Sequence, residues 1–371
     1  MRPYIFFPLA AAAALTSCGP ASAPGGSRPL KDAVGDRFTI GAAVVTRQMS
    51  GEDSVGAAVL RRHFNSVVDE NRMKCETIHP FEDVYNFAGG DSIAQFAEEN
   101  HMELIGHCLV WHSQCAPWFF VDTAGRDVSA DVLRRRIRDH IFTVVGRYRG
   151  KVKGWDVCNE VIVEDGSFRD SPLYRIMGPE FIYASLQYAH EADPDAELYL
   201  NDYGMSVAGR RDGYLALIDS VQARGLRLDG IGMQGHMGMD YPSTEEFEKS
   251  LVAFASKGVK VMVTEWDMSA LPTVSQSANV SDTVASAHDP YPAALPDSVA
   301  RVWNERMAAF WGLFLRHSDK ISRVTVWGVT DANSWKNDFP VVGRHDYPLL
   351  FDRDGQPKPF LRDFLEGRSG E

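Results

Sequence analysis

Two glutamates, Glu160 and Glu265, each end a short run of residues that is typical of a buried strand, 154–159 and 261–264. Burial disfavours the charged form of a carboxylate, so a glutamate in such a place must be hydrogen-bonded, paired or chemically useful. Either one alone could be a strand-end residue paired with a Lys or Arg. Two together favour cleavage of a glycosidic bond, in which one carboxyl group protonates the leaving oxygen and the other attacks the sugar carbon.

Polar and aromatic side chains also follow the other predicted strands. Pyranose faces stack on aromatic rings, while sugar hydroxyls need amide, carboxylate and imidazole partners. A lone tryptophan is usually core and a lone histidine is usually a satisfied hydrogen-bonding group, but their concentration at strand ends predicts a sugar-binding groove. The residues are Glu70, Asn71, Lys74, His107, Trp111, His112, Gln114, Asn159, Asn201, Asp202, Tyr203, Gln234, His236, Asp267, Trp327, Asp331 and Trp335.

The elements that position these side chains alternate along the chain. Eight apolar runs are predicted as strands, at 38–44, 65–69, 104–108, 154–159, 198–201, 230–234, 259–264 and 324–327. Amphipathic stretches between them are predicted as helices, at 55–64, 132–149, 181–192, 214–224, 247–256 and 299–317. Eight strand–helix repeats without consecutive hairpins indicate parallel strands that close into a barrel. The expected fold class is α/β, a (β/α)8 TIM barrel that forms a single catalytic domain over residues 37–368.

The charge of the chain limits its partners. Its 371 residues carry a formal net charge of -12, and no basic stripe stands out that could neutralise phosphates. Nucleic acid is therefore not an expected partner, and a neutral or weakly charged ligand is. No cofactor or metal is expected, and the protein is predicted to be a monomer.

The N-terminal segment is predicted to lie outside the fold. Arg2 precedes an apolar run, 5–15, which is too short to span a bilayer and indicates a secretory signal over residues 1–17. The segment ends as bacterial lipoprotein signals do, before Cys18, which would carry the lipid. Residues 18–36 would then be a flexible tether. The protein is expected to be exported and anchored to the bacterial cell envelope, at the outer membrane or in the periplasm, with the cell surface as a further option. The alternative is an ordinary signal peptide whose cysteine is incidental.

Four further cysteines, Cys75, Cys108, Cys115 and Cys158, have spacings that are neither zinc-like nor typical of a small disulfide-rich domain. Most of them are expected to be buried free thiols, with one pair near the barrel top as an option. The segment 272–296 is weakly periodic and follows the strand that carries Glu265. It is either a loop that borders the cleft or an insertion without a role.

Six ordered blocks of this sequence resemble the signature blocks of family-10 glycoside hydrolases, the endo-β-1,4-xylanases. The blocks are FNSVVDENRMK at 64–74, HCLVWHSQ at 107–114, WDVCNE at 155–160, GIGMQGH at 230–236, VTEWD at 263–267 and TVWGVTDANSW at 325–335. The resemblance covers residues 38–365. It implies a (β/α)8 barrel that hydrolyses xylan and xylo-oligosaccharides with retention of the anomeric configuration.

The resemblance also implies a role for each matching residue. Glu160 would be the general acid/base and Glu265 the nucleophile. Asn159 would hold the sugar 2-hydroxyl. His236 and Asp267 would orient Glu265 and keep it ionised. The substrate-binding residues would be Glu70, Asn71, Lys74, His107, Trp111 and Gln114 around the xylose on the non-reducing side, Gln234 beside the nucleophile, Trp327 and Trp335 as a roof that stacks on the sugar, and Tyr203 on the leaving-group side.

The sequence departs from the family pattern at Cys75, where tryptophan is common, at Cys108, where threonine is common, and at Trp266, where leucine is usual. Trp266 would either narrow the floor of the site or, as we expect, pack in the core. Two other functions remain open: a β-1,4-glucanase on a related barrel, and a non-catalytic lipoprotein that binds polysaccharide.

Overall fold

Eight parallel strands close into a barrel in the computed structural model, which describes residues 28–272 and 289–368. The sheet runs β6-β5-β4-β3-β2-β1-β9-β8, and pairing of β8 with β6 closes it. The strands are β1 (Thr39–Val44), β2 (Ser66–Asp69), β3 (Glu103–Trp111), β4 (Val152–Asn159), β5 (Glu197–Asp202), β6 (Gly230–Met233), β8 (Lys260–Met268) and β9 (Ile321–Val326). A further strand of two residues, β7 (His236–Met237), pairs with the end of β8.

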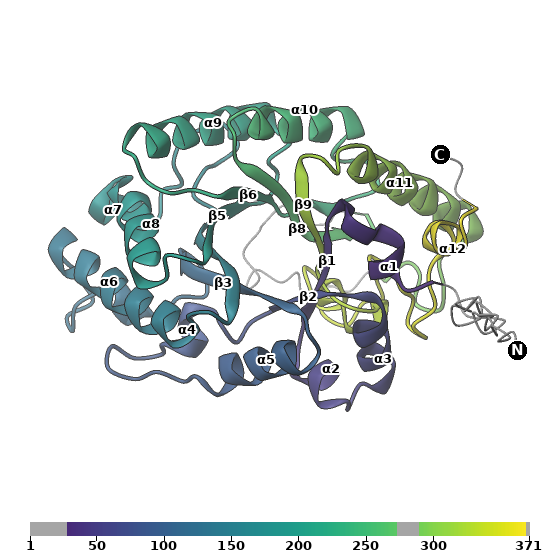
Figure 1. Ribbon diagram of the computed structural model, residues 1–371, viewed down its shortest axis with the longest axis horizontal. Coiled ribbons are helices and arrows are strands. Elements are labelled where there is room, and N and C mark those ends of the chain that lie inside the picture. Colours follow the sequence, from purple (N-terminus) through teal and green to yellow (C-terminus); the bar gives the residue numbers. More distant parts are fainter. Residues whose placement is uncertain (1–27, 273–288, 369–371) are drawn as a thin grey trace, which may run out of the picture.

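Helices surround the barrel (Figure 1). They are α1 (Leu30–Val34), α2 (Thr46–Ser50), α3 (Ser54–His63), α4 (Cys75–Ile78), α5 (Ala88–Glu99), α6 (Ala130–Arg147), α7 (Pro172–Met177), α8 (Glu180–Ala192), α9 (Ala208–Ala223), α10 (Thr244–Ala255), α11 (Asp297–Arg316) and α12 (Pro359–Leu365). Short 3-10 helices occupy Gly35–Arg37, Pro117–Phe119, Asp331–Asn333 and Trp335–Asn337. Because helices cover the outer face of the sheet and side chains fill its interior, the strands are buried along almost their whole length, as in β8 after Lys260.

Serine caps fix where two of these helices begin. The hydroxyl of Ser129 accepts a hydrogen bond from the backbone of Val132 at the start of α6, and that of Ser243 accepts one from Glu246 at the start of α10. Each cap satisfies a backbone N–H group that has no partner inside its helix.

All eight predicted strands form, and the barrel is confirmed. The predicted ends differ most in β3 and β8, which continue to Trp111 and Met268, and in β9, which begins at Ile321. The expected tether over residues 18–36 is wrong for its last part, because residues 30–34 form α1. Leu30 and Val34 lie one helical turn apart and are buried in the core. The predicted signal, Cys18 and the first part of the tether lie outside the described residues.

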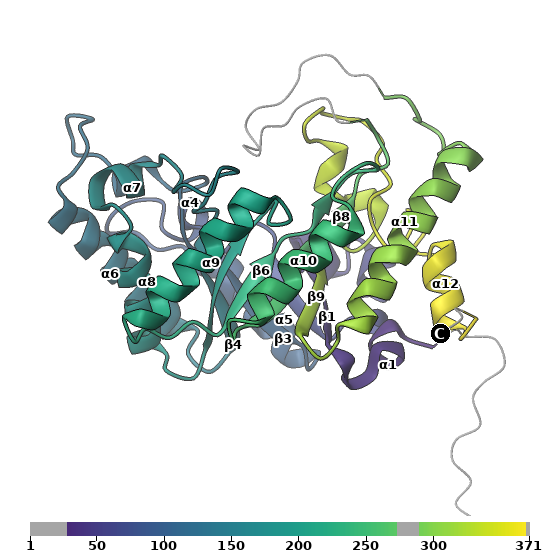
Figure 2. The same ribbon diagram turned by 90° about the horizontal axis from the view of Figure 1, so that it is seen from above.

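The loops at the carboxyl ends of the strands gather at one end of the barrel, and the loop after β9 projects there (Figure 2). Residues 273–288 of the predicted loop 272–296 lie outside the described range. Beyond them, the carboxylate of Asp289 accepts hydrogen bonds from His345, and the backbone of Tyr291 accepts one from Tyr347. Among the described helices, none is both long and apolar enough to cross a bilayer.

Candidate active site

A cleft of about 1040 Å³ opens at the carboxyl ends of the strands. It receives side chains from loops that are far apart in the sequence, because a barrel brings every strand end to one face. Asp267 lies behind this surface, in contact with His236. The other residues to which the family resemblance gives a role all line the cleft: Glu70, Asn71, Lys74, His107, Trp111, Gln114, Asn159, Glu160, Tyr203, Gln234, His236, Glu265, Trp327 and Trp335. Four further polar residues of the predicted groove do not line it: His112, Asn201, Asp202 and Asp331.

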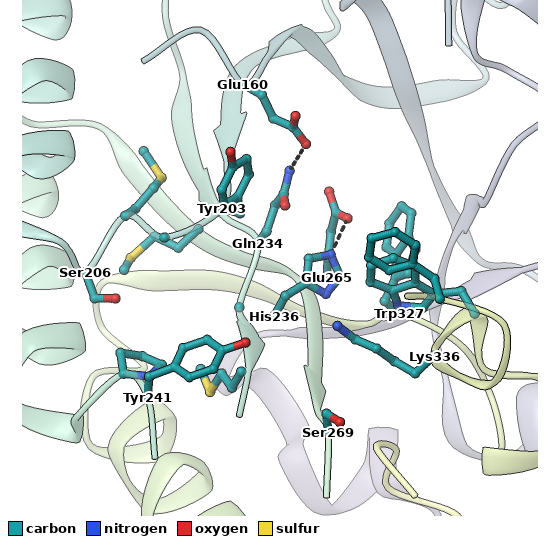
Figure 3. A pocket seen from close by; sticks show the side chains of 18 of the residues that line it. Glu160, Tyr203, Ser206, Gln234, His236, Tyr241, Glu265, Ser269, Trp327 and Lys336 are labelled. Carbon is teal, nitrogen blue, oxygen red and sulfur yellow. Dashed lines mark hydrogen bonds and ion pairs between the residues drawn. The ribbon is translucent and has the colours of Figure 1, made fainter. Parts of the chain in front are cut away.

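Glu160 follows β4 and is only 7% exposed. Its carboxyl group accepts hydrogen bonds from two neutral donors, the indole of Trp111 at 3.0 Å and the amide of Gln234 at 3.2 Å. Figure 3 shows the contact with Gln234. Burial raises the pKa of Glu160, and the negative charge of Glu265 raises it further, against the hydrogen bonds and the charge of Arg169. The group is therefore poised to hold a proton.

Glu265 projects from β8 and is 4% exposed. One carboxylate oxygen accepts a hydrogen bond from the amide of Asn201 at 2.8 Å, and the other lies 3.1 Å from Nε2 of His236. Burial alone would raise the pKa of Glu265, but the hydrogen bond to His236, the electrostatic effects of His107 and His236 and the hydrogen bond from Asn201 outweigh it, so the pKa is lowered. This carboxylate is held charged.

His236 lies between two carboxylates. Its Nδ1 is 3.0 Å from Oδ2 of Asp267, which also accepts a hydrogen bond from the indole of Trp335 at 2.8 Å. Burial would lower the pKa of His236, but the charges of Asp267 and Glu265 and the hydrogen bonds to them raise it to about 9. The ring is therefore an imidazolium at neutral pH and is a donor at both nitrogens. The pairing of β7 with β8 sets His236 directly opposite Asp267.

Asn201, at the end of β5, links the surroundings of the two glutamates. Its amide nitrogen donates to Asn159 at 2.9 Å as well as to Glu265, and its carbonyl accepts the hydroxyl of Thr264 at 2.6 Å. Asn201 is completely buried. Asn201 is one of the polar strand ends named from the sequence, but no role in binding or support is predicted for it there. Its place in an apolar strand could have indicated such a role, because a buried amide must find hydrogen-bond partners.

One wall of the cleft holds a network around Lys74. Its ammonium group donates to the carbonyl oxygens of Gln114 at 2.7 Å and Asn71 at 3.1 Å. It also lies over the ring of Trp111, 5.2 Å from the centroid. Burial raises the pKa of the neighbouring Glu70 to about 7, although the charge of Lys74 opposes this. These side chains present donors and acceptors at fixed positions.

The two cleft tryptophans differ in their surroundings. Trp327 is 6% exposed and packs on the small apolar cluster of Ala43, Val68 and Ile105. Trp335 is more exposed and stacks on Phe339 with ring centroids 5.1 Å apart. Trp327 therefore also belongs to the core, and Trp335 packs against the same cluster as a partly buried ring.

His107 is fixed by a carboxylate, since its Nδ1 lies 2.8 Å from Oδ2 of Asp156. At the other end of the cleft, Arg169 donates to the backbone carbonyl of Glu160 at 2.8 Å and to the hydroxyl of Tyr203 at 3.0 Å. Arg169 was not predicted. The sequence could have suggested Arg169, because it follows the catalytic Glu160 closely, in the loop after β4 where Ile162 pairs with Phe168.

The family departures have local explanations. Trp266 is completely buried, and its ring stacks parallel to Trp311, so the expected packing role is confirmed. Cys75, Cys108 and Cys158 are buried free thiols, and Cys115 is a free thiol that is partly exposed. Within the described residues, no group of His, Cys, Asp and Glu side chains has an arrangement that could hold a metal ion.

A parallel barrel whose cleft has aromatic and amide walls and holds one carboxyl group with a raised pKa and one with a lowered pKa defines a class of enzyme. This class is the glycoside hydrolases that work with two carboxyl groups. The model of "Glycosyl hydrolase family 10" matches residues 29–366. The chain belongs to this family.

Named relatives agree with this assignment. The chain is 42% identical to endo-1,4-beta-xylanase A of Xylanibacter ruminicola over 91% of its own length and 92% of that protein. The structure of a GH10 endoxylanase retrieved from a sugarcane soil metagenome is 38% identical and superposes with a TM-score of 0.86, over 92% of this chain and 99% of that one. The intracellular xylanase of Thermoanaerobacterium saccharolyticum, solved as an alanine mutant with xylotriose, is 31% identical with a TM-score of 0.79, over 90% and 98% of the two chains.

Proposed function

We propose that this protein is a retaining endo-1,4-β-xylanase in which Glu160 is the general acid/base and Glu265 the nucleophile. The observation that carries the assignment of roles is the opposite direction of the two pKa shifts in one cleft. The acid must hold a proton and the nucleophile must be charged in the resting enzyme. Membership of the family and similarity to named endo-1,4-beta-xylanases support the substrate, xylan and xylo-oligosaccharides.

The first step cleaves the glycosidic bond. Glu160 gives its proton to the leaving oxygen while a carboxylate oxygen of Glu265 attacks the anomeric carbon, which forms a covalent glycosyl-enzyme. The imidazolium of His236 keeps Glu265 ionised before the attack. Asn201 fixes the other oxygen of that carboxylate, so the attacking atom is positioned before the sugar arrives.

The second step hydrolyses the intermediate. Glu160, now a carboxylate, takes a proton from water as the water attacks the anomeric carbon, so two inversions give net retention. The charge of Glu265 is one reason that the pKa of Glu160 is raised. That charge disappears when Glu265 becomes an ester, so the pKa of Glu160 falls just when the group must act as a base.

The remaining cleft residues would hold the sugar chain. Asn159 would bind the 2-hydroxyl, and its side chain is already fixed by Asn201. The wall around Lys74 would bind the xylose on the non-reducing side, together with Glu70, Asn71, His107, Trp111 and Gln114. Gln234 would act beside both glutamates, Trp327 and Trp335 would cover the glycone, and Tyr203 would stack on the leaving-group side.

Product analysis tests the proposed function. Purified protein should release reducing sugars from xylan at a far higher rate than from carboxymethylcellulose, and ¹H NMR should show the β-anomer first. Faster hydrolysis of carboxymethylcellulose would favour the glucanase alternative. Binding of xylan without any sugar release would favour the non-catalytic alternative.

The two tryptophans need separate tests. Trp335→Ala should weaken xylan hydrolysis with a small change in melting temperature. Trp327→Ala should lower both, because truncating a buried tryptophan costs about 3–5 kcal/mol of stability. A large fall in melting temperature with an unchanged KM in Trp335→Ala would show that this ring also serves the core.

We further propose that the mature protein begins at Cys18 and is lipid-anchored to the cell envelope. The support is the short apolar run that ends in Leu15, Thr16, Ser17 and Cys18. Cys18→Ala should move the active enzyme from the membrane fraction to the soluble fraction. Unchanged fractionation of this variant would contradict the anchor.

A further inference from the structure

Two thiols lie in contact next to Lys74 and Gln114, which line the cleft. Cys75 is the first residue of α4 and is 3% exposed, and Cys115 follows the end of β3. Their Sγ atoms are 3.0 Å apart, although 40 residues separate them in the sequence. A covalent S–S bond is about 2.05 Å long, so small side-chain rotations suffice to form it. The two remaining cysteines of the described residues, Cys108 and Cys158, are buried free thiols.

The backbone around these thiols is already tied together. The amide of Glu76 donates to the carbonyl of Gln114 at 3.0 Å, and the side chain of Gln114 donates to Glu76 at 3.2 Å. On the other side of the pair, Lys74 donates to Gln114 at 2.7 Å. Each cysteine is thus the direct neighbour of a residue that lines the sugar-binding wall. A bond between the sulfurs would join segments that the fold has already brought into register.

We propose that Cys75 and Cys115 form a disulfide bond that locks the wall of the cleft on which Lys74 and Gln114 lie. The role in sugar binding rests on the proposed function, whereas formation of the bond does not. The bond would remove the freedom of the α4 segment relative to the end of β3. Lys74 and Gln114 would then be held ready for the sugar hydroxyls rather than ordered at the moment of binding.

The oxidant would be a disulfide of the glutathione or oxidoreductase class. The thiolate of Cys115, the more exposed of the two, attacks this disulfide and releases one thiol, and Cys75 then displaces the second. In total the two cysteines lose two electrons and two protons, and the oxidant becomes two thiols. Burial raises the pKa of the Cys115 thiol well above its usual range, so the exchange is expected to be slow at neutral pH in the folded protein.

Peptide mapping tests whether the bond forms. The full chain is incubated with oxidised glutathione, denatured, alkylated and digested without reductant. Trypsin leaves Cys75, Cys108 and Cys115 on one peptide, 75–126, because no Lys or Arg interrupts it, and chymotrypsin separates them by cutting after Trp111 and at earlier aromatic residues. The expected product links the Cys75 and Cys115 fragments, with Cys108 and Cys158 alkylated. Alkylated Cys75 and Cys115, stable glutathione adducts on them, or a link to Cys108 would overturn the proposal.

Matched variants test what the bond does. Reduction of the parent should lower its melting temperature by several degrees and raise KM for xylo-oligosaccharides by about 2- to 10-fold, as expected for loss of preorganisation of one side chain, with kcat little changed. The Cys75→Ser/Cys115→Ser variant should match the reduced parent and ignore reductant. Cys158→Ser should respond as the parent does. Equal KM values for oxidised and reduced parent would overturn the locking role. A protein that is inactive both oxidised and reduced would refute the proposed function. The peptide map would still show whether Cys75 and Cys115 form a disulfide bond.

Discussion

Glu160 and Glu265 are buried to almost the same extent, 7% and 4% exposed, yet their pKa values shift in opposite directions. The donors that contact the carboxyl group of Glu160 are neutral, an indole and an amide. Glu265 instead contacts an imidazolium, which is itself held by Asp267. At equal burial the charge of the nearest partner decides which carboxyl group keeps its proton. Five experiments probe this contrast.

The largest effects should come from removing the two carboxyl groups. Glu265→Ala cannot form the glycosyl-enzyme and should lose about 10⁵-fold or more in kcat on xylan and on aryl xylobiosides alike. Glu160→Ala should lose about 10²- to 10⁴-fold on xylan, but should still form the intermediate from a dinitrophenyl xylobioside, whose leaving group needs no proton.

Azide then separates the two roles. Added azide should accelerate turnover of Glu160→Ala and give a β-glycosyl azide, because it replaces the water that Glu160 no longer activates. If Glu265→Ala gave the β-glycosyl azide instead, the roles assigned to Glu160 and Glu265 would have to be reversed. If the parent enzyme gave products of inverted configuration, the retaining mechanism would be refuted.

His236→Asn should convert the surroundings of Glu265 into neutral ones. Loss of a charged hydrogen bond, about 1.5–3 kcal/mol, corresponds to about 10- to 150-fold in kcat/KM. Without the imidazolium the pKa of Glu265 should rise, so the acid limb of the pH profile should move to higher pH. The exposed His190→Asn serves as the control. If the acid limb stayed in place, Asn201 and the other donors would be sufficient to keep the pKa of Glu265 low without His236.

The stability of the parent should depend on the same ion pair. The pKa of His236 is raised from 6.5 to about 9 on folding, so its contribution is complete below pH 6.5 and is lost as the pH rises through 9. Relative to His236→Asn, the free energy of unfolding of the parent should fall by on the order of 3 kcal/mol between pH 6 and pH 10. Urea titrations at several pH values measure this difference, and parallel curves for the two proteins would refute it.

The smallest effect should come from Arg169→Met. Its hydrogen bond to the backbone of Glu160 is worth about 1 kcal/mol, so kcat should fall by roughly 5-fold. The charge of Arg169 lowers the pKa of Glu160, so its removal should raise that pKa and move the basic limb to higher pH. Arg175→Met, in the nearby α7, should leave the limb in place. A basic limb that moves to lower pH would contradict the electrostatic role.

Much of this site could be predicted because a parallel barrel places every strand end on one face, so that finding the strands was enough to bring Glu160, Glu265 and their neighbours together. What could not be predicted depends on distances. His236 is charged because two carboxylates, those of Glu265 and Asp267, lie within hydrogen-bond distance of its ring. The contact between Asn201 and Asn159 depends on the register in which β5 pairs with β4, and the sequence does not reveal that register. Helix α1 was missed because its five residues are too short to show helical periodicity against a segment rich in Gly and Pro.

The backbone of Glu160 has a positive φ of 59°, a left-handed conformation that costs roughly 1–2 kcal/mol for a residue with a Cβ atom. Glycine adopts it freely. An alanine in place of Glu160 removes the carboxyl group and keeps the strain. Glu160→Gly should therefore be as slow as Glu160→Ala and at least as stable. It should be the better of these two variants for capturing a bound xylan chain in crystals.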